Sequence, residues 1–349
     1  MKRVSIFLIS TALIAGMVGC GDGGGGGPFQ PSQNLEIRTW YDLDDVRDNL
    51  AGNHTLMNDL DSTTLGYEEL ASPTAHGGKG WEPIGIFIPE RGGGFWGTFD
   101  GQGYEIRDLF INRPDEELVG LFGSVEGYWE GAEVIGGTIK DVGVINVTVV
   151  GEVMVGGLVG WNDGTVSNSY STGSVVGDSR VGGLMGNNGG TVSDSYSTSS
   201  VTGSNFVGGL AGIAHNVSNC YATGDVTGDE VVGGLVGWHT GGTVSYSYAT
   251  GNVTGSSSVG GLVGDNDGEG AVSNCFWDIQ TSGQSTSDGG TGKNTTEMQE
   301  IATFTDTETE GLDEPWDIAT VADPATPNPA YIWNIPITPP DYPFLSWET

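Results

Sequence analysis

The sequence is short of basic residues and of cysteine. Its 349 residues include 11 lysines and arginines against 45 aspartates and glutamates, so the formal net charge at pH 7 is −34. A chain of this charge repels the phosphates of nucleic acids and anionic lipid surfaces, which excludes nucleic acid as a partner. After Cys20 only Cys220 and Cys275 remain, and an exported pair of cysteines raises the question of a disulfide.

The first residues predict export and a lipid anchor. Residues 1–19 combine a basic start with an apolar core too short for a comfortable transmembrane helix, which is the pattern of a secretory signal. The segment Met17-Val18-Gly19-Cys20 resembles the lipobox of bacterial and archaeal lipoproteins, and this resemblance implies lipidation of Cys20. A glycine-rich, flexible linker follows, so residues 20–34 are interpreted as a lipidated tether.

The centre of the chain repeats a phrase that begins Val-Gly-Gly-Leu. Its copies start at intervals of 26, 26, 25 and 27 residues, and each continues into a turn and then T-V-S-x-S-Y-x-T-G-x-V-x-G or a close variant. A fixed period in this range is typical of stacked repeat architectures. The unit has no run with helical periodicity, and its short Val, Thr and Tyr segments between turn residues predict strands. The five copies start at Val155, Val181, Val207, Val232 and Val259.

These repeats predict an all-β solenoid in which one repeat of about 26 residues makes one coil and pairs in parallel with the next. Equivalent residues should then form columns along the stack. Internal columns are predicted for Leu158, Leu184, Leu210, Leu235 and Leu262, and for Val166, Val192, Val217, Val244 and Val272. A third column is aromatic, either inside or outside the coil, and consists of Tyr170, Tyr196, Tyr221, Tyr248 and Phe276.

The same register decides the question of the disulfide. Cys220 and Cys275 fall in one column but are separated by Ser247. Two rungs place their Cα atoms about 10 Å apart, and a disulfide spans less than roughly 7 Å. Both cysteines are therefore predicted to be small buried residues with free thiols.

The repeats closely resemble the GLUG motif, named for its Gly-Leu-hydrophobic-Gly core, which here is Gly157-Leu158-Val159-Gly160 and its four later copies. Gly97–Ile106 looks like the opening coil of a pectin-lyase-like right-handed β-helix. The resemblance implies a right-handed parallel β-helix or solenoid with short helical caps. We predict an N-terminal cap and first coils over residues 35–118, GLUG repeats over 119–280 and a C-terminal capping segment over 281–349, with cap helices at Trp40–Leu50 and Thr295–Ala302.

No catalytic, cofactor-binding or metal-ligating residue is predicted. GLUG repeats also resemble parts of some immunoglobulin A metallopeptidases, but none of the four histidines has the zinc-protease pattern, and His215 and His239 are interpreted as solvated turn residues. The acidic turn Asp265–Gly270 has Phe276 where a calcium loop needs its last acid, so it is interpreted as a repeat turn. Gly289–Asn294 lacks the spacing of a phosphate loop.

Two functional hypotheses follow. The first is a non-enzymatic, lipid-anchored protein of the cell surface with a structural, adhesion or binding role, expected to be a monomer, with glycans or surface proteins as candidate ligands. The second is a polysaccharide-binding or polysaccharide-acting protein of the pectin-lyase type. Between Val155 and Val272 the only Lys or Arg is Arg180. The repeats therefore offer few cations to stabilise the anion that develops in a polysaccharide lyase reaction. Trp161 and Trp238 occupy equivalent turn positions, but Asn187, Ile213 and Asp265 interrupt any continuous aromatic platform.

Overall fold

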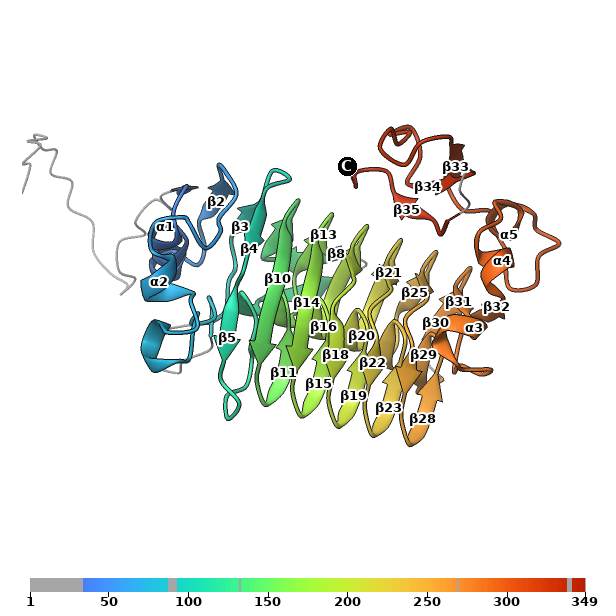
Figure 1. The fold of residues 1–349 in the computed structure, drawn as a ribbon, viewed down its shortest axis with the longest axis horizontal. Helices are drawn as coiled ribbons and strands as arrows, with labels where there is room; N and C mark the ends of the chain where they lie inside the picture. Colours follow the sequence, from blue (N-terminus) through green and yellow to red (C-terminus); the bar gives the residue numbers. More distant parts are fainter. Residues whose placement is uncertain (1–33, 87–92, 132, 269, 338–340, 349) are drawn as a thin grey trace, which may run out of the picture. The chain divides into compact units, whose positions relative to one another are not determined.

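The structure is a computed structural model that describes residues 34–86, 93–131, 133–268, 270–337 and 341–348. Cys20, the signal sequence and the glycine-rich linker lie outside these residues. Within them the chain forms a stack of parallel β-coils with short helices at both ends (Figure 1). The predicted all-β solenoid is confirmed.

Three parallel sheets run along the stack. In the described residues the long sheet contains β1 (Glu36–Ile37), β2 (Asn53–Leu56), β3 (Thr98–Asp100), β6 (Phe122–Val125), β9 (Thr138–Lys140), β12 (Val159–Asn162), β13 (Thr165–Ser167), β16 (Met185–Ser193), β20 (Ala211–Ser218), β24 (Val236–His239), β25 (Thr243–Ser245), β29 (Val263–Asn266) and β30 (Ala271–Ser273). The tyrosine sheet contains β4 (Glu105–Arg107), β5 (Phe110–Asn112), β10 (Gly143–Val150), β14 (Tyr170–Val176), β17 (Tyr196–Ser197), β18 (Ser200–Thr202), β21 (Tyr221–Ala222), β22 (Val226–Thr227), β26 (Tyr248–Ala249), β27 (Val253–Thr254), β31 (Phe276–Asp278) and β32 (Thr291–Lys293). The narrow sheet contains β11 (Val153–Gly156), β15 (Ser179–Gly182), β19 (Asn205–Gly208), β23 (Glu230–Gly233) and β28 (Ser257–Gly260).

One repeat makes one coil. The second copy passes from β15 in the narrow sheet through β16 in the long sheet to β17 and β18 in the tyrosine sheet, and then enters β19. The register joins Val155 to Val181, Val181 to Val207, Val207 to Val232 and Val232 to Val259, as the sequence spacing predicted.

The interior columns are those predicted. All five leucines of the Leu158 column are fully buried, and the backbone N–H of Leu184 donates to the carbonyl of Leu210 at 3.0 Å. The valine column that starts at Val166 is buried except for the half-buried Val272 at its end. Each buried leucine stabilises the folded state by roughly 1.5–3 kcal/mol. A column of equivalent leucines therefore builds a hydrophobic core although each coil contributes few large apolar side chains.

The paired glycines of each copy keep the coil small. A Cβ on Gly183 would lie 2.0 Å from Oγ of Ser197 and 2.4 Å from the carbonyl oxygen of Gly209. No side chain fits in that space, because real Cβ contacts are longer. The glycine pair therefore lets the backbone of one coil approach both its own far wall and the next coil.

Two corner columns adopt the left-handed backbone region although they hold residues other than glycine. The corner before each Tyr of the repeats consists of Asn168, Asp194, Asn219, Tyr246 and Asn274, with φ between 46° and 53°. Asn and Asp tolerate this region, which explains their prevalence at the corner. The corner before each Val-Gly-Gly-Leu consists of Met154, Arg180, Phe206, Val231 and Ser258, with φ between 49° and 57°.

The N-terminal end is closed by helices α1 (Trp40–Asp44) and α2 (Tyr67–Leu70) and the 3-10 turns η1 (Asp45–Asp48) and η2 (Ala75–Gly77). The helix predicted over Trp40–Leu50 is wrong in its extent. It begins after a Thr39 N-cap with an Asp42 capping box, and its last turn tightens into η1, as helix ends commonly do. Of the three apolar residues at helical spacing, Leu43 and Val46 are buried and Leu50 is half-buried, and Trp40 is buried as well.

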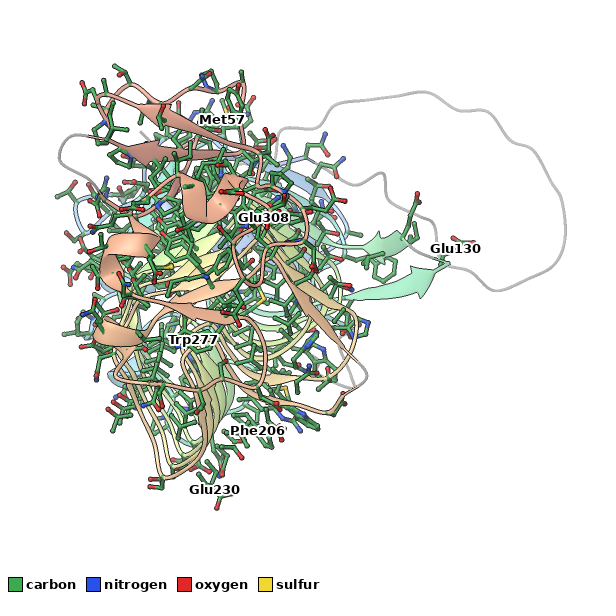
Figure 2. All side chains as sticks on the ribbon, turned by 90° about the vertical axis from the view of Figure 1, so that its right-hand side faces the viewer. Met57, Glu130, Phe206, Glu230, Trp277 and Glu308 are labelled. Atoms are coloured by element: carbon green, nitrogen blue, oxygen red, sulfur yellow. The ribbon has the colours of Figure 1, made fainter. Side chains whose placement is uncertain are left out.

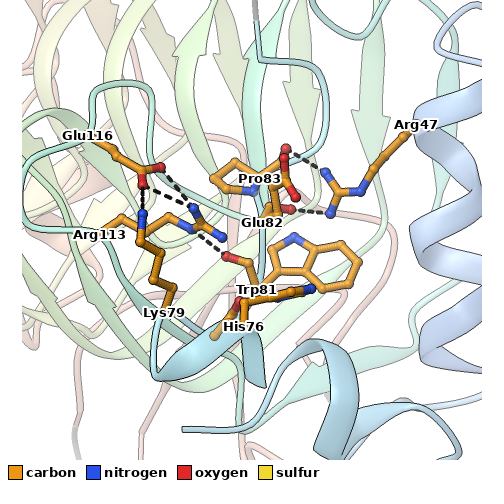
Figure 3. A network of polar contacts seen from close by, with 9 residues as sticks. Arg47, His76, Lys79, Trp81, Glu82, Pro83, Arg113 and Glu116 are labelled. Carbon is orange, nitrogen blue, oxygen red and sulfur yellow. Dashed lines mark hydrogen bonds and ion pairs between the residues drawn. The ribbon is translucent and has the colours of Figure 1, made fainter. Parts of the chain in front are cut away.

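Polar contacts hold this cap to the first coils (Figure 3). The guanidinium of Arg47 lies 4.8 Å from the Trp81 ring centroid and donates to the carbonyl oxygen of Pro83 at 2.7 Å. The largely buried Arg113 donates to the Trp81 carbonyl oxygen at 2.9 Å and forms an ion pair with Glu116. These basic residues therefore serve the fold at the cap.

The C-terminal segment continues past the last coil through α3 (Ile279–Ser282), α4 (Thr295–Met298) and α5 (Ala302–Thr305). Asn294 and Glu297 form a capping box at the start of α4, but the helix predicted over Thr295–Ala302 is two shorter helices. A small sheet of β33 (Ile318–Val321), β34 (Trp333–Pro336) and β35 (Phe344–Leu345) follows. We name residues 294–337 and 341–348 the C-terminal strap.

One insertion leaves the stack. Strands β7 (Gly127–Glu130) and β8 (Glu133–Gly136) form an antiparallel hairpin, and Glu130 lies on the part that projects from the coils in Figure 2. The register resumes immediately afterwards, because Thr138 pairs with Thr165. Among the described residues no helix is both long and apolar enough to cross a membrane.

Candidate functional site

The aromatic column lies on the outer face of the tyrosine sheet. Residues alternate sides along a strand, and Ser171 and Ser197, which follow Tyr170 and Tyr196, are fully buried inside the coil. The tyrosines therefore point outward. This settles the alternative that the sequence left open.

The tyrosine rings stack from coil to coil. The ring centroids of Tyr170 and Tyr196 are 4.7 Å apart with an interplanar angle of 13°, and those of Tyr196 and Tyr221 are 4.7 Å apart at 6°. Tyr221 and Tyr248 continue the stack at 5.1 Å and 5°. The centroid spacing follows the roughly 4.8 Å rise of the coils, so backbone register sets the ring geometry.

The C-terminal strap covers one end of this aromatic column. Trp333 is fully buried and its ring centroid lies 5.8 Å from that of Tyr248, whose hydroxyl donates to the carbonyl oxygen of Pro343 at 2.5 Å. Trp316 and Phe304 pack on Phe276 in the same way. These contacts form a second apolar cluster outside the coil, separate from the core inside it.

The cover is incomplete at the other end. Tyr248 and Tyr221 are 1% and 6% exposed, whereas Tyr196 and Tyr170 are half-buried. Between these two rings, the first coils and the end of the strap lies a groove of about 820 Å³, within the usual range for ligand sites. We name it the tyrosine groove. It is lined by Gln102, Gly103, Glu105, Asp141, Val142, Gly143, Asn168, Tyr170, Tyr196, Pro324, Ala325, Trp347 and Glu348.

Three aromatic rings form the apolar part of the groove. The Trp347 ring centroid lies 5.8 Å from that of Tyr196 at 27° and 6.0 Å from that of Tyr170 at 40°. Gly143 occupies the position before Tyr170 in the column, and a Cβ there would lie 2.4 Å from Cζ of Tyr170. The missing side chain thus gives the Tyr170 ring its place beside the groove.

Carboxylates and amides form the polar part. The Tyr170 hydroxyl donates to the carboxylate of Glu105, which also pairs with Arg107. Asn168 donates to Asp141 Oδ1 at 2.9 Å, and Lys140 Nζ lies 3.1 Å from Asp141 Oδ2. Of the described residues that line the groove, none is Lys or Arg. Arg107 and Lys140, which pair with these two carboxylates, are not among the lining residues.

Glu348 closes the groove at the strap. Its carboxylate accepts hydrogen bonds from the Tyr221 hydroxyl at 2.8 Å and from the backbone N–H of Leu345 at 2.5 Å. Burial raises the pKa of Glu348 to about 7, against the lowering effect of these two bonds. Burial also raises the pKa of Tyr170 and of Tyr196 above the ordinary tyrosine value, so their hydroxyls remain protonated donors at neutral pH.

The groove combines the groups that recognise a small polar molecule with an apolar face. The Trp347 ring and the edges of the stacked tyrosine rings offer an apolar surface, and the carboxylates, amides and hydroxyls offer acceptors and donors around it. Ligand sites commonly consist of aromatic side chains with a few placed polar groups.

The sequence contained part of the signal for this site. Repetition placed the tyrosines in one column, but it gave no sign of the strap, because the partners Trp316, Trp333 and Trp347 lie far away in the chain and follow no repeat.

The other predicted sites have different outcomes. Cys20 lies outside the described residues. The register confirms that Trp161, Asn187, Ile213, Trp238 and Asp265 form one column, so the two tryptophans are not adjacent. Trp238 stacks on Phe206 at 5.2 Å instead.

The interpretation of His215 and His239 as solvated turn residues is wrong. Both lie in strands of the long sheet, and His239 is fully buried, where its Nε2 lies 3.2 Å from the carbonyl oxygen of His215. β24 includes both Trp238 and His239, and because residues alternate sides along a strand, Trp238 points outward and His239 inward. His239 thereby joins an internal column with Asn162, Asn188 and Ala214.

The acidic side chains form no metal centre among the described residues, where no group of three or more His, Cys, Asp or Glu side chains is placed to hold a metal ion. In the turn at Asp265, burial and the neighbouring Asp288 raise the pKa of the Asp265 carboxyl. Gly292 and Lys293, from the loop compared with a phosphate loop, lie in β32 and pair with β31.

Cys220 and Cys275 are buried free thiols, as predicted. Each replaces a serine of its column, and the Sγ atom of each donates to the carbonyl oxygen two residues earlier at 3.1 Å, as the hydroxyl of Ser247 does at 2.7 Å. Burial raises the pKa of Cys275 to about 12 and raises that of Cys220 further above its ordinary value. Neither thiol is a reactive nucleophile.

The fold and register define a parallel β-solenoid with an external aromatic column. Comparison with known proteins shows that its coils carry GLUG repeats: the family model described as "The GLUG motif" matches residues 151–176, 203–227 and 228–254. The predicted likeness of Gly97–Ile106 to a pectin-lyase-like coil stays a prediction.

Two relatives and one solved structure are similar to the chain. A "Putative Gly-rich membrane protein" of Evansella cellulosilytica is 37% identical over 139 residues, which are 38% of this chain and 14% of that protein. "Halomucin" of Haloquadratum walsbyi is 35% identical over 98 residues, 28% of this chain and 1% of that protein. The chain thus spans a small part of the length of either relative. A "putative immunoglobulin A1 protease" from Bacteroides ovatus has the same fold, with a TM-score of 0.60 and 20% identity over 92% of this chain and 94% of that one.

Proposed function

We propose that this chain is a lipid-anchored, non-enzymatic solenoid of the cell surface that binds a ligand in the tyrosine groove. The observation that carries the proposal is the partial cover of the aromatic column. The strap buries Tyr221 and Tyr248, yet leaves Tyr170 and Tyr196 at the wall of a groove of about 820 Å³. Coils that pair along three sheets hold these rings in fixed positions, so the site is preorganised.

The surface location rests on the sequence and on relatives. The lipobox-like segment before Cys20 and the glycine-rich linker after it support an anchor with a flexible tether. The names of the two relatives, a Gly-rich membrane protein and a halomucin, agree with a place in or on the cell envelope.

The anchor is tested by the Cys20→Ser variant of the full chain. Wild-type protein is expected in the membrane fraction and in the detergent phase of a detergent extraction, and on intact cells it is expected to be accessible to added protease. The variant is expected in the aqueous phase. Equal partition of both forms into the aqueous phase would refute lipid anchoring.

An enzyme that acts on polysaccharide is the second candidate, because carboxylates line the same groove. Glu105 and Asp141 are each held by a hydrogen bond from a neighbouring side chain and by a nearby cation, which suits fixed acceptors better than groups that must exchange a proton. A reducing-sugar release assay on neutral and uronate polysaccharides separates the two candidates, and release of product would favour the enzyme.

A further inference from the structure

The tyrosine groove has the chemistry of a saccharide site, and its charges select among saccharides. We propose that it binds an uncharged oligosaccharide, with pyranose rings against Trp347 and the ring edges of Tyr170 and Tyr196, and hydroxyl groups bonded to Asp141, Glu105 and Asn168. This inference rests on the proposed binding function and names its ligand class.

The aromatic part of the groove sets the shape of the ligand. Tyr170, Tyr196 and Trp347 pack against one another with centroids 4.7 to 6.0 Å apart, so no space remains between the rings for a small ligand to enter. Tyr196 is stacked between Tyr170 and Tyr221, so a ligand must lie along the edges of the tyrosine rings and against Trp347. A cage for a small organic ammonium ion needs separated rings around the cation, which this packing does not offer.

The polar part sets the hydrogen bonding. An ionised carboxylate only accepts hydrogen bonds, and it keeps free lone pairs after one or two contacts. Asp141 and Glu105 both line the groove and each accepts a hydrogen bond from a protein side chain, but Oε2 of Glu105 is buried, so Asp141 is the main carboxylate acceptor for a ligand. The ligand should therefore present several O–H donors, and a pyranose does so around a ring that also has apolar C–H faces.

The charges around the groove give no strong attraction for either a cationic or an anionic ligand. Arg107 pairs with Glu105 and Lys140 pairs with Asp141, and the third lining carboxyl, Glu348, accepts hydrogen bonds from Tyr221 and Leu345. An anionic sugar would meet carboxylate oxygens and no lining cation, in a protein whose formal net charge is −34. A polyuronate is thus the least suitable polysaccharide, although a pectin-lyase type of protein would take it.

The groove also has room for more than one sugar. Its volume of about 820 Å³ lies near the upper end of the roughly 300–1,000 Å³ found for ligand sites, and Gly103 and Gly143 place no side chains in its wall. The strap residues Pro324 and Ala325 also line it. A chain of two or more pyranoses fits these limits better than a single small molecule.

The experiment uses the full chain, purified in mild detergent, and isothermal titration with defined probes. The neutral probes are tetrasaccharides of glucose, galactose, mannose and N-acetylglucosamine, and the charged probes are a galacturonate tetrasaccharide and tetramethylammonium chloride. We expect binding of at least one neutral tetrasaccharide and of neither charged probe. If no neutral probe binds, or if a charged probe binds more tightly than every neutral one, the inference is overturned.

Variants locate the site. Tyr170→Ala and Trp347→Ala are each expected to weaken binding of the neutral probe about tenfold or more, because they remove part of the aromatic surface. Trp238→Ala is the matched control, since Trp238 stacks on Phe206 away from the groove, and it should bind as the wild type does. Thermal melts by circular dichroism identify a variant that fails to fold, and Trp347→Ala, at the end of the strap, spares the coils. Unchanged affinity in both folded groove variants would refute the site.

Failure of this inference is distinct from failure of the proposed function. A chain that is anchored at the surface but binds no neutral probe would contradict only the saccharide site. A chain that binds the probe but partitions into the aqueous phase would contradict only the anchor.

Discussion

The hydroxyl of Tyr221 donates a 2.8 Å hydrogen bond to Glu348, a residue 127 positions later in the chain. Tyr221 belongs to the third GLUG copy, and Glu348 lies at the end of the strap. The bond thus joins the repeated tyrosine column to the strap, which has no counterpart elsewhere in the repeats. It also places an ionisable group where the strap meets the coil.

The burial of Glu348 predicts a pH dependence of stability. Burial raises the pKa of Glu348 from 4.5 to about 7, so the folded protein holds a proton that the unfolded chain releases between these values. Stability contributed at this site is complete below pH 4.5 and is lost as the pH rises to about 7, with a change of about 3 kcal/mol. Thermal melts at pH 5 and pH 8 should show a smaller decrease for Glu348→Gln than for wild type.

The exposed Glu310 provides the control for this measurement, because Glu310→Gln changes the net charge by the same amount. Its melting temperature should depend on pH as that of the wild type does. If Glu348→Gln also follows the wild type, Glu348 does not titrate near neutrality.

Replacement of one core leucine should unfold the whole stack. Leu210 is fully buried and pairs with coils on both sides, so Leu210→Asp places an unpaired charge in the core at a cost of several kcal/mol. Circular dichroism should show loss of the cooperative melt. A similar substitution at the exposed Thr202 should leave the melt nearly unchanged, and a normal melt for Leu210→Asp would contradict the assignment of the core.

The thiols test the register of the coils. Cys220 and Cys275 are two rungs apart with Ser247 between them, so wild type lacking Cys20 should release two titratable thiols on unfolding without reductant. In the native state both should resist alkylation, because burial raises their pKa values. Ser247→Cys adds a thiol one rung, about 4.8 Å, from each, and mild oxidation should leave fewer than three. A Cys220–Cys275 crosslink in the wild type would refute one coil per repeat.

Substitution of Val231 should relieve backbone strain at the corner before the fourth Val-Gly-Gly-Leu copy. Val231 has a φ of 56°, where a β-branched side chain is strained. Val231→Asn is expected to raise the free energy of unfolding by about 1 kcal/mol, measured by chemical denaturation. Val232→Asn, at the fully buried neighbour, should lower it. Destabilisation of both variants to a similar extent would show that packing of Val231 outweighs its backbone strain.

Repetition explains which features the sequence could predict. Because Val155, Val181 and Val207 recur at a fixed interval, their pairing follows from one alignment, and with it the buried leucines and the separation of the two cysteines. The strap shows the limit of this reasoning. Trp333 and Trp347 follow no repeat, and their contacts with the tyrosines depend on the path of the whole C-terminal segment.

Predictions from local sequence patterns were wrong where tertiary packing determines where a helix or strand ends. The helix predicted over Trp40–Leu50 ends in a 3-10 turn at Asp48, next to Arg47, which bonds to Asp44 and to the chain at Pro83. His239 is interpreted from the sequence as a solvated turn residue, but β24 includes it and its side chain is buried. Corner residues such as Val231 give no sequence signal, since the left-handed region is unusual for valine.

The contacts of the strap with the aromatic column constrain the number of repeats in this protein. In most solenoids a coil contacts only its neighbours, so evolution can add or delete units with little penalty. Here Trp347 packs on Tyr170 of the first copy, Trp333 on Tyr221 and Tyr248 of the third and fourth, and Trp316 on Phe276 of the fifth. Deletion of one coil would shorten the column by about 4.8 Å while the strap kept its length, so these rings would lose alignment. The fixed length of the strap therefore limits the gain or loss of coils during evolution.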